Sequence, residues 1–224
     1  MDTLNIGLIR VLTLTDQREI DRHGSIIESA FPGLKVTSSC IENHPKGLYD
    51  KASEEEAKPK IIGLAKELEK GVETIIVSCA ADPAVVELKE MLNIPVVGAG
   101  ESLAAVSRTL GDSVGVLTIT NEVPNPVAKG LQEHCLAWTK VEGVETTLDL
   151  KGDDIVARAV NAANDLKNQG CDVIALACTG FSTIGVAPKI GREVGIPVVD
   201  PVLAAGSIAY HLMLNREGWK DAKD

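Results

Sequence analysis

Aromatic residues are scarce in this sequence. Phe, Trp and Tyr together make up 3% of the 224 residues, whereas hydrophobic residues reach 45%. A buried core must therefore consist mainly of Val, Ile, Leu and Ala, which is the composition of parallel sheets covered by helices. A chain of this length forms one large domain or two small ones.

Positive charge is also in short supply. The chain has 22 Lys and Arg against 32 Asp and Glu, which gives a net charge of −10. Because nucleic acids and anionic membranes are bound through basic clusters, we expect neither as a partner. No apolar run reaches the roughly 18 residues that cross a bilayer. The opening residues, MDTLNIGLIRV, lack the basic region of a signal peptide. We therefore expect a cytoplasmic protein.

The cysteines form no recognisable metal or disulfide pattern. They are odd in number and irregularly spaced, and they lie at positions 40, 79, 135, 171 and 178. Without a CxxC pair, or two His residues four apart, we expect no metal site. We expect reduced thiols. The glycine motif Gly98-Ala99-Gly100 lacks a third glycine and precedes Glu101, so we expect no dinucleotide cofactor, nor any other.

Short apolar runs predict strands at 6–11, 34–39, 74–77, 96–97, 114–119, 136–141, 173–177 and 198–199. Helical patterns lie between them, at 16–30, 61–68, 82–92, 101–110, 124–135, 153–168, 186–194 and 201–216. Alternation of the two predicts an α/β fold with parallel sheets.

The pattern occurs twice along the chain. "GVETIIVSCAADP" (71–83) matches "GCDVIALACTGFS" (170–182), and "NIPVVGAGESLAA" (93–105) matches "GIPVVDPVLAAGS" (195–207). "IGLIRVLTLTD" (6–16) matches "VGVLTITNEVP" (114–124), so all three pairs follow the same order. We predict two pseudo-symmetric lobes, each a four-stranded parallel sheet flanked by helices, with the active site in the cleft between them.

Cys79 and Cys178 occupy equivalent positions in the two repeats, each at the end of an apolar strand. Ligands bind at the carboxyl ends of parallel strands, where the next helix N-terminus can lower the pKa of a thiol. Two such thiols on opposite faces of a carbon, with sulfurs on the order of 7 Å apart, suit stereoinversion by proton removal and return. Backbone N–H groups of 80–82 and 179–181 would hold the enolate oxygen. The alternative is that both cysteines simply fill space.

At these residues the sequence resembles the aspartate/glutamate/hydantoin racemase superfamily. "SCAADPAV" resembles the first-cysteine motif of the hydantoin racemase branch, "ACTGFSTIG" the second-cysteine motif, and residues 42–61 the loop and helix between the second and third strands. The resemblance implies cofactor-independent chemistry on a small molecule and a homo-oligomer. It also implies that a C-terminal helix returns to the first lobe. The lobes would then be 1–99 with 206–224, and 100–205.

Departures from the glutamate racemase pattern bear on the substrate. Ala80 and Ala81 follow the first cysteine, and Gly180 stands where that branch has His. The groups that handle an ammonium are thus mostly missing, and only Thr179 matches. We expect a 5-substituted hydantoin or allantoin. Aspartate or glutamate racemisation, and cis–trans isomerisation or decarboxylation of a small carboxylic acid, remain alternatives. So does a non-catalytic two-lobed binding protein.

The expected catalytic residues are Cys79 and Cys178. The expected substrate-binding residues are Thr13, Pro45, Ala80, Ala81, Asp82, Thr118, Thr120, Thr179 and Gly180. Asp82 is alternatively the N-cap of a helix that begins at Pro83. Arg10 is expected either to point to the cleft or to pair with an acid. His44 lies in a predicted cleft loop, whereas His23, His134 and His211 lie in helical patterns and are interpreted as structural.

Overall fold

Two parallel sheets organise the molecule. The computed structural model describes residues 3–152 and 154–215. Within them, strands β1 (Leu4–Arg10), β2 (Leu34–Cys40), β3 (Thr74–Ser78) and β4 (Val96–Gly98) form the first sheet. Strands β5 (Val114–Thr118), β6 (Cys135–Lys140), β7 (Val173–Leu176) and β8 (Val198–Val199) form the second. The strand orders are β2-β1-β3-β4 and β6-β5-β7-β8, and all pairings are parallel. The prediction of two equivalent four-stranded lobes is therefore confirmed.

Helices connect successive strands, as parallel pairing requires. In chain order the described residues contain α1 (Gln17–Ala30), α2 (Lys51–Leu68), α3 (Val85–Met91), α4 (Ala99–Leu110), α5 (Asn125–Leu131), α6 (Asp154–Asn168), α7 (Gly180–Thr183), α8 (Ala187–Val194) and α9 (Pro201–Leu214). Short 3₁₀ turns occur at Gln132–His134 and Thr147–Asp149. None of these helices combines the length and the apolar character needed to span a bilayer.

Side chains of the adjoining turns explain several helix starts. Asp16 accepts a hydrogen bond from the Arg18 backbone at the start of α1. Asp50 and Ser53 form a capping box at the start of α2, which begins ten residues earlier than the apolar spacing predicted. The sequence did not predict α7, because four residues are too few to show a helical period. The last part of the predicted C-terminal helix, 216–224, lies outside the described residues.

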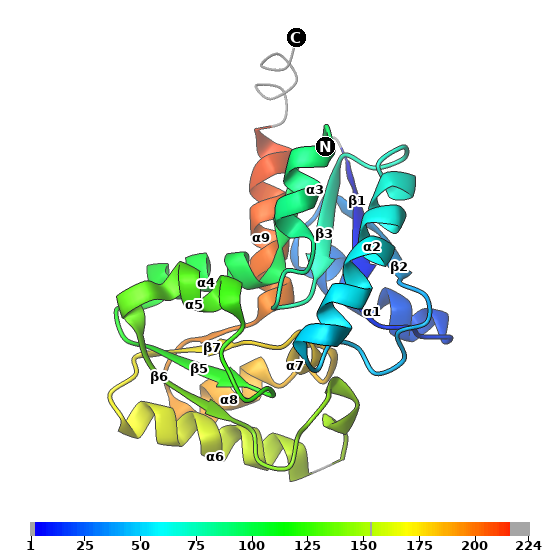
Figure 1. The fold of residues 1–224 in the computed structure, drawn as a ribbon. Coiled ribbons are helices and arrows are strands. Elements are labelled where there is room, and N and C mark those ends of the chain that lie inside the picture. The colour runs from blue at the N-terminus through cyan, green and yellow to red at the C-terminus, as the bar shows by residue number, and fades with distance from the viewer. Residues whose placement is uncertain (1–2, 153, 216–224) are drawn as a thin grey trace.

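One face of each sheet is covered by helices from its own half of the chain. On the first sheet, Ala57, Ile61 and Ala65 of α2 pack against Ile9 and Val77. On the second sheet, α6 and α8 pack in the same way over β5 and β7. Figure 1 shows α2 beside the first sheet and α6 below the second.

The helices that follow the fourth strands cross between the lobes. Leu103 and Ala104 of α4 pack against Val116 and Val173 of the second sheet, although α4 follows the last strand of the first. Conversely, Ala205, Ala209 and Met213 of α9 belong to the core of the first sheet, with Ile6 and Ile76. Figure 1 shows α9 running back alongside the first sheet. The two lobes thus exchange one helix each.

Candidate active site at the junction of the two lobes

Cys79 and Cys178 lie at the carboxyl ends of the equivalent central strands. Cys79 follows β3 directly, and Cys178 follows β7 after one residue. The Cys79 side chain is partly buried, and Cys178 is 7% exposed. Both positions are those expected from the internal repeat.

A direct hydrogen bond joins the two cysteine turns. The Thr179 hydroxyl donates to the Ser78 carbonyl oxygen at 3.3 Å, across 101 positions of sequence. Thr179 follows Cys178, and Ser78 precedes Cys79. The fold therefore brings the two thiols to one junction, each presented by a different lobe.

Burial dominates the electrostatics of both thiols. It raises the pKa of Cys79 to about 12 and the pKa of Cys178 to about 11. Backbone N–H groups act in the opposite direction, and the Gly180 N–H lies 3.3 Å from the Cys178 sulfur. The sequence-based expectation of a lowered thiol pKa is thus wrong. Desolvation outweighs the helix ends and turn amides.

Gly180 leaves space for a loop from its own lobe. A Cβ added there would lie 2.6 Å from Leu150 Cδ1, 3.5 Å from Thr147 Cγ2 and 3.3 Å from the Cys178 sulfur. A larger residue would require the end of the Leu150 side chain to shift. The absence of a His side chain at position 180 is consistent with this close contact.

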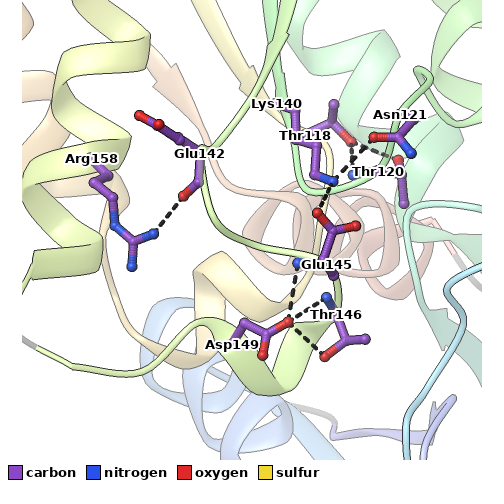
Figure 2. Close-up of polar contacts among 9 residues, drawn as sticks. All are labelled: Thr118, Thr120, Asn121, Lys140, Glu142, Glu145, Thr146, Asp149 and Arg158. Carbon is purple, nitrogen blue, oxygen red and sulfur yellow. Dashed lines mark hydrogen bonds and ion pairs between the residues drawn. The ribbon is translucent and has the colours of Figure 1, made fainter.

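The loop of residues 141–150 is held in shape by its own polar contacts, drawn in Figure 2. Lys140 bonds the Glu145 carboxylate at 2.8 Å. One Asp149 carboxylate oxygen accepts from the backbone N–H groups of Glu145 and Thr146 and from the Thr146 hydroxyl. Arg158 donates to the Glu142 carbonyl. The loop is therefore preorganised beside the second thiol.

Thr147, in this loop, touches both lobes. A Cβ on Gly47, in the first lobe, would lie 3.4 Å from the Thr147 hydroxyl oxygen. That oxygen is buried and has no hydrogen-bond partner among residues 3–152 and 154–215. No sequence pattern points to Thr147, because only the folded loop places it between Gly47 and the Cys178 turn.

The Asp82 carboxylate caps a helix N-terminus through a tertiary contact, and the helix is not the one predicted. The carboxylate accepts from the backbone N–H groups of Gly100 at 2.7 Å and Glu101 at 2.6 Å, at the start of α4. The prediction that it caps the helix starting at Pro83 is wrong. Asp82 and Ala84 have positive φ, and α3 begins only at Val85. Burial raises the pKa of Asp82 to about 7.

The second lobe has an equivalent hydrogen-bonded link, in which the carboxylate belongs to the residue before the helix instead of to the thiol turn. The Ser182 hydroxyl, just after Cys178, donates to the Asp200 carboxylate at 2.8 Å. Asp200 accepts from the backbone N–H groups of Val202 and Leu203 and so caps α9. In both lobes, a carboxylate ties the thiol turn to the helix after the fourth strand. These helix N-termini are filled by protein carboxylates and do not offer the free N–H groups that bind phosphates.

The remaining predicted binding residues stabilise turns near the strand ends. The hydroxyls of Thr118 and Thr120 lie 2.9 Å apart, and Thr120 donates to the Glu122 carbonyl. The Thr13 hydroxyl donates to the Ile41 carbonyl and accepts from the His44 backbone N–H. Each hydroxyl is therefore already bonded within the protein.

The other predicted positions differ in their exposure. Pro45 is exposed, Ala81 is partly buried and Ala80 is buried. His44 is buried, and its Nδ1 lies 3.4 Å from the Lys60 ammonium. The binding roles of all these residues remain predictions.

The Arg10 guanidinium forms no ion pair with an acid among the described residues. It is buried and donates to the Glu19 and Ile20 carbonyls of α1. Burial lowers the pKa of Arg10.

Comparison with known proteins gives a consistent picture. The family described as Asp/Glu/Hydantoin racemase matches residues 23–209. A hydantoin racemase of Rhizobium meliloti is 25% identical over 187 residues, covering 80% of this chain and 76% of the relative. One of Paenarthrobacter aurescens is 24% identical over 153 residues, covering 66% of this chain and 64% of the relative, slightly less than two thirds of its length. An allantoin racemase from Klebsiella pneumoniae has a similar fold, with a TM-score of 0.82, 21% identity and coverage of 95% and 88% of the two chains.

Proposed function

The chain belongs to the Asp/Glu/Hydantoin racemase family, and from that premise we propose that it is a cofactor-independent racemase using Cys79 and Cys178. One thiol acts as base and the other as acid at a carbon next to a carbonyl. The observation that carries the proposal is the placement of these thiols at equivalent strand ends of opposing lobes, with adjoining residues bonded to each other. A substrate between them would present one face of its carbon to each lobe.

The reaction requires one thiolate and one thiol. The thiolate takes the proton from the substrate carbon and becomes a thiol, while the electron pair moves into an enolate. The second thiol then gives its proton to the opposite face and becomes the thiolate. In the reverse direction the two residues exchange roles. No redox step is involved, and each turnover conserves the protons of the pair.

The raised pKa values of the thiols determine how much thiolate is present and how strong a base it is. With a pKa of about 11, the fraction of thiolate at pH 8 is roughly one in a thousand. The rare thiolate is correspondingly a stronger base, suited to a weakly acidic carbon. The Gly180 N–H close to the Cys178 sulfur would stabilise the thiolate as it forms.

A neutral ring amide is the substrate class that we propose, either a 5-substituted hydantoin or allantoin. Ala80, Ala81 and Gly180 supply no side chain that could pair with an ammonium or a carboxylate. The relatives that are named hydantoin racemases and the structure that is named allantoin racemase support this class. All five cysteines are unpaired, which supports a reducing compartment such as the cytoplasm.

Proton exchange in D₂O tests the proposal. Single enantiomers of 5-substituted hydantoins, allantoin, aspartate and glutamate would be followed by NMR and optical rotation together. We expect deuteration and loss of rotation for a hydantoin-type compound, abolished by Cys79→Ser and by Cys178→Ser. Cys135→Ser, at a partly buried cysteine that begins β6 and so lies at the opposite end of its strand from the junction, should remain active. Racemisation that persists in both site variants would refute the two-thiol mechanism.

A further inference from the structure

A buried histidine bridges the two lobes behind the thiols. His23, on α1 of the first lobe, is 1% exposed. Its Nδ1 lies 2.8 Å from the Ser78 hydroxyl at the end of β3. Its Nε2 lies 2.8 Å from the Thr183 hydroxyl in α7 of the second lobe. One rigid ring thus bonds to both halves of the molecule.

Both partners of His23 adjoin the cysteine turns. Ser78 immediately precedes Cys79, and Thr183 ends the short helix that begins two residues after Cys178. The Thr179 hydroxyl completes the connection by donating to the Ser78 carbonyl. The path from one thiol turn through His23 to the other therefore consists of hydrogen bonds and a few covalently linked residues.

The surroundings of His23 favour the neutral imidazole. Burial, followed by the positive charges of Arg10 and Arg22, holds the pKa of His23 well below its usual range. A neutral ring has one N–H donor and one acceptor nitrogen, and a hydroxyl can complement either. Arg22 adds a second contact between the same helices, because its Nε donates to the Thr183 carbonyl at 3.0 Å.

We propose that His23 is a positioning residue that sets the separation of Cys79 and Cys178 by holding Ser78 and Thr183 at fixed distances. This inference rests on the proposed racemase function and adds a residue to it. His23 touches neither thiol, so its effect passes through the turns that carry them. The sequence pattern was interpreted as placing His23 in a helix with a structural role only. The proposed positioning role goes beyond that interpretation.

Three substitutions test the two hydrogen bonds of the His23 ring separately. His23→Asn keeps a nitrogen near the position of Nδ1, and His23→Gln keeps one near Nε2. Thr183→Val removes one hydroxyl while preserving the size and branching of the side chain, so it tests the bridge even where the His23 variants fail to fold. His211→Asn, at an exposed position of α9, is the matched control.

We expect kcat to fall in all three site variants, by up to about 100-fold for a displacement of about 1 Å, while KM stays nearly unchanged. The ratio of α-deuteration with retention to inversion should rise, because the second thiol no longer reaches the opposite face in time. The losses in His23→Asn and Thr183→Val should be less than additive when combined, since both remove the same bond. His211→Asn should leave every quantity unchanged.

Bifunctional thiol cross-linkers of graded length provide a readout that needs no turnover. In the wild type, we expect only cross-linkers within a narrow range of lengths to join Cys79 and Cys178, as identified by mass spectrometry. In the His23 variants, we expect cross-linkers of a broader range of lengths to join them. Folded variants with wild-type kcat, retention-to-inversion ratio and cross-linking range would overturn the inference. If the wild type racemises nothing, the proposed function fails, while cross-linking still decides whether His23 fixes the spacing.

Discussion

Gly100 permits the first thiol turn to dock on α4, and replacing it with alanine tests that close approach. It is the second residue of α4. A Cβ there would overlap the Ala80 carbonyl oxygen and lie 2.9 Å from an Asp82 carboxylate oxygen. The nearest obstacle is backbone rather than a flexible side-chain end. The peptide between Ala80 and Ala81 must therefore move by about 1 Å, because packed interiors contain little spare space.

The expected magnitude follows from opposing effects. Overpacking a buried site costs about 1–3 kcal/mol, whereas alanine gains up to about 1 kcal/mol over glycine inside a helix. We therefore expect Gly100→Ala to lower the free energy of unfolding by about 1–2 kcal/mol. Because Ala80 adjoins Cys79, a displacement of about 1 Å should also reduce the rate of α-proton exchange by roughly 100-fold.

Urea unfolding and the exchange assay measure the two effects, with Gly63→Ala as the control. Gly63 is an exposed residue of α2, and a Cβ there would meet nothing within 4 Å. Its replacement should stabilise the protein by about 0.5–1 kcal/mol and leave exchange unchanged. If Gly100→Ala were stabilising like Gly63→Ala and fully active, the docking of the thiol turn on α4 would be refuted.

Three further predictions concern the same junction. The rate of alkylation of Cys79 and Cys178 by iodoacetamide, followed by mass spectrometry, should keep rising with pH above pH 9, because burial raises their pKa values to about 12 and about 11. A rate that levels off near the ordinary thiol pKa of about 8.5 would contradict this. Ser182→Ala should lower the free energy of unfolding by about 1 kcal/mol in urea, because Asp200 loses a buried donor, and an unchanged midpoint would dismiss that bond. Thr147→Val should raise the free energy of unfolding by about 1 kcal/mol, since it removes a buried hydroxyl without a partner among the described residues; destabilisation would show that the hydroxyl is bonded in solution.

The fold was predictable because its signals are local and occur twice. Apolar runs located all eight strands within the described residues, and the repeated order of motifs predicted two equivalent sheets. The positions of Cys79 and Cys178 followed from the same repeat. Most strand ends and helix starts shifted by a few residues, but α2 begins ten residues before its predicted start, where the Asp50–Ser53 capping box decides the boundary.

The contacts that shape the site depend on tertiary packing and were not predictable. Asp82 caps a helix that starts 17 residues further along the chain, and its predicted target was the nearer one. His23 was correctly placed in a helix, but its partners lie 55 and 160 positions away. The direction of the thiol pKa shifts was wrong because burial is a property of the assembled lobes rather than of the strand ends.

Helices α4 and α9, which each pack on the sheet of the other lobe, determine whether either lobe could fold alone. Each half of the chain carries a helix whose apolar side chains complete the core of the other half. The molecule therefore has the architecture of a domain-swapped dimer whose two similar protomers are joined into one chain. A cut in the short connection between α4 and β5 would leave two complementary fragments, each with one sheet face that has lost part of its cover. We therefore expect the two halves to fold in one cooperative step, and the spacing of the thiols to be established only when both are complete.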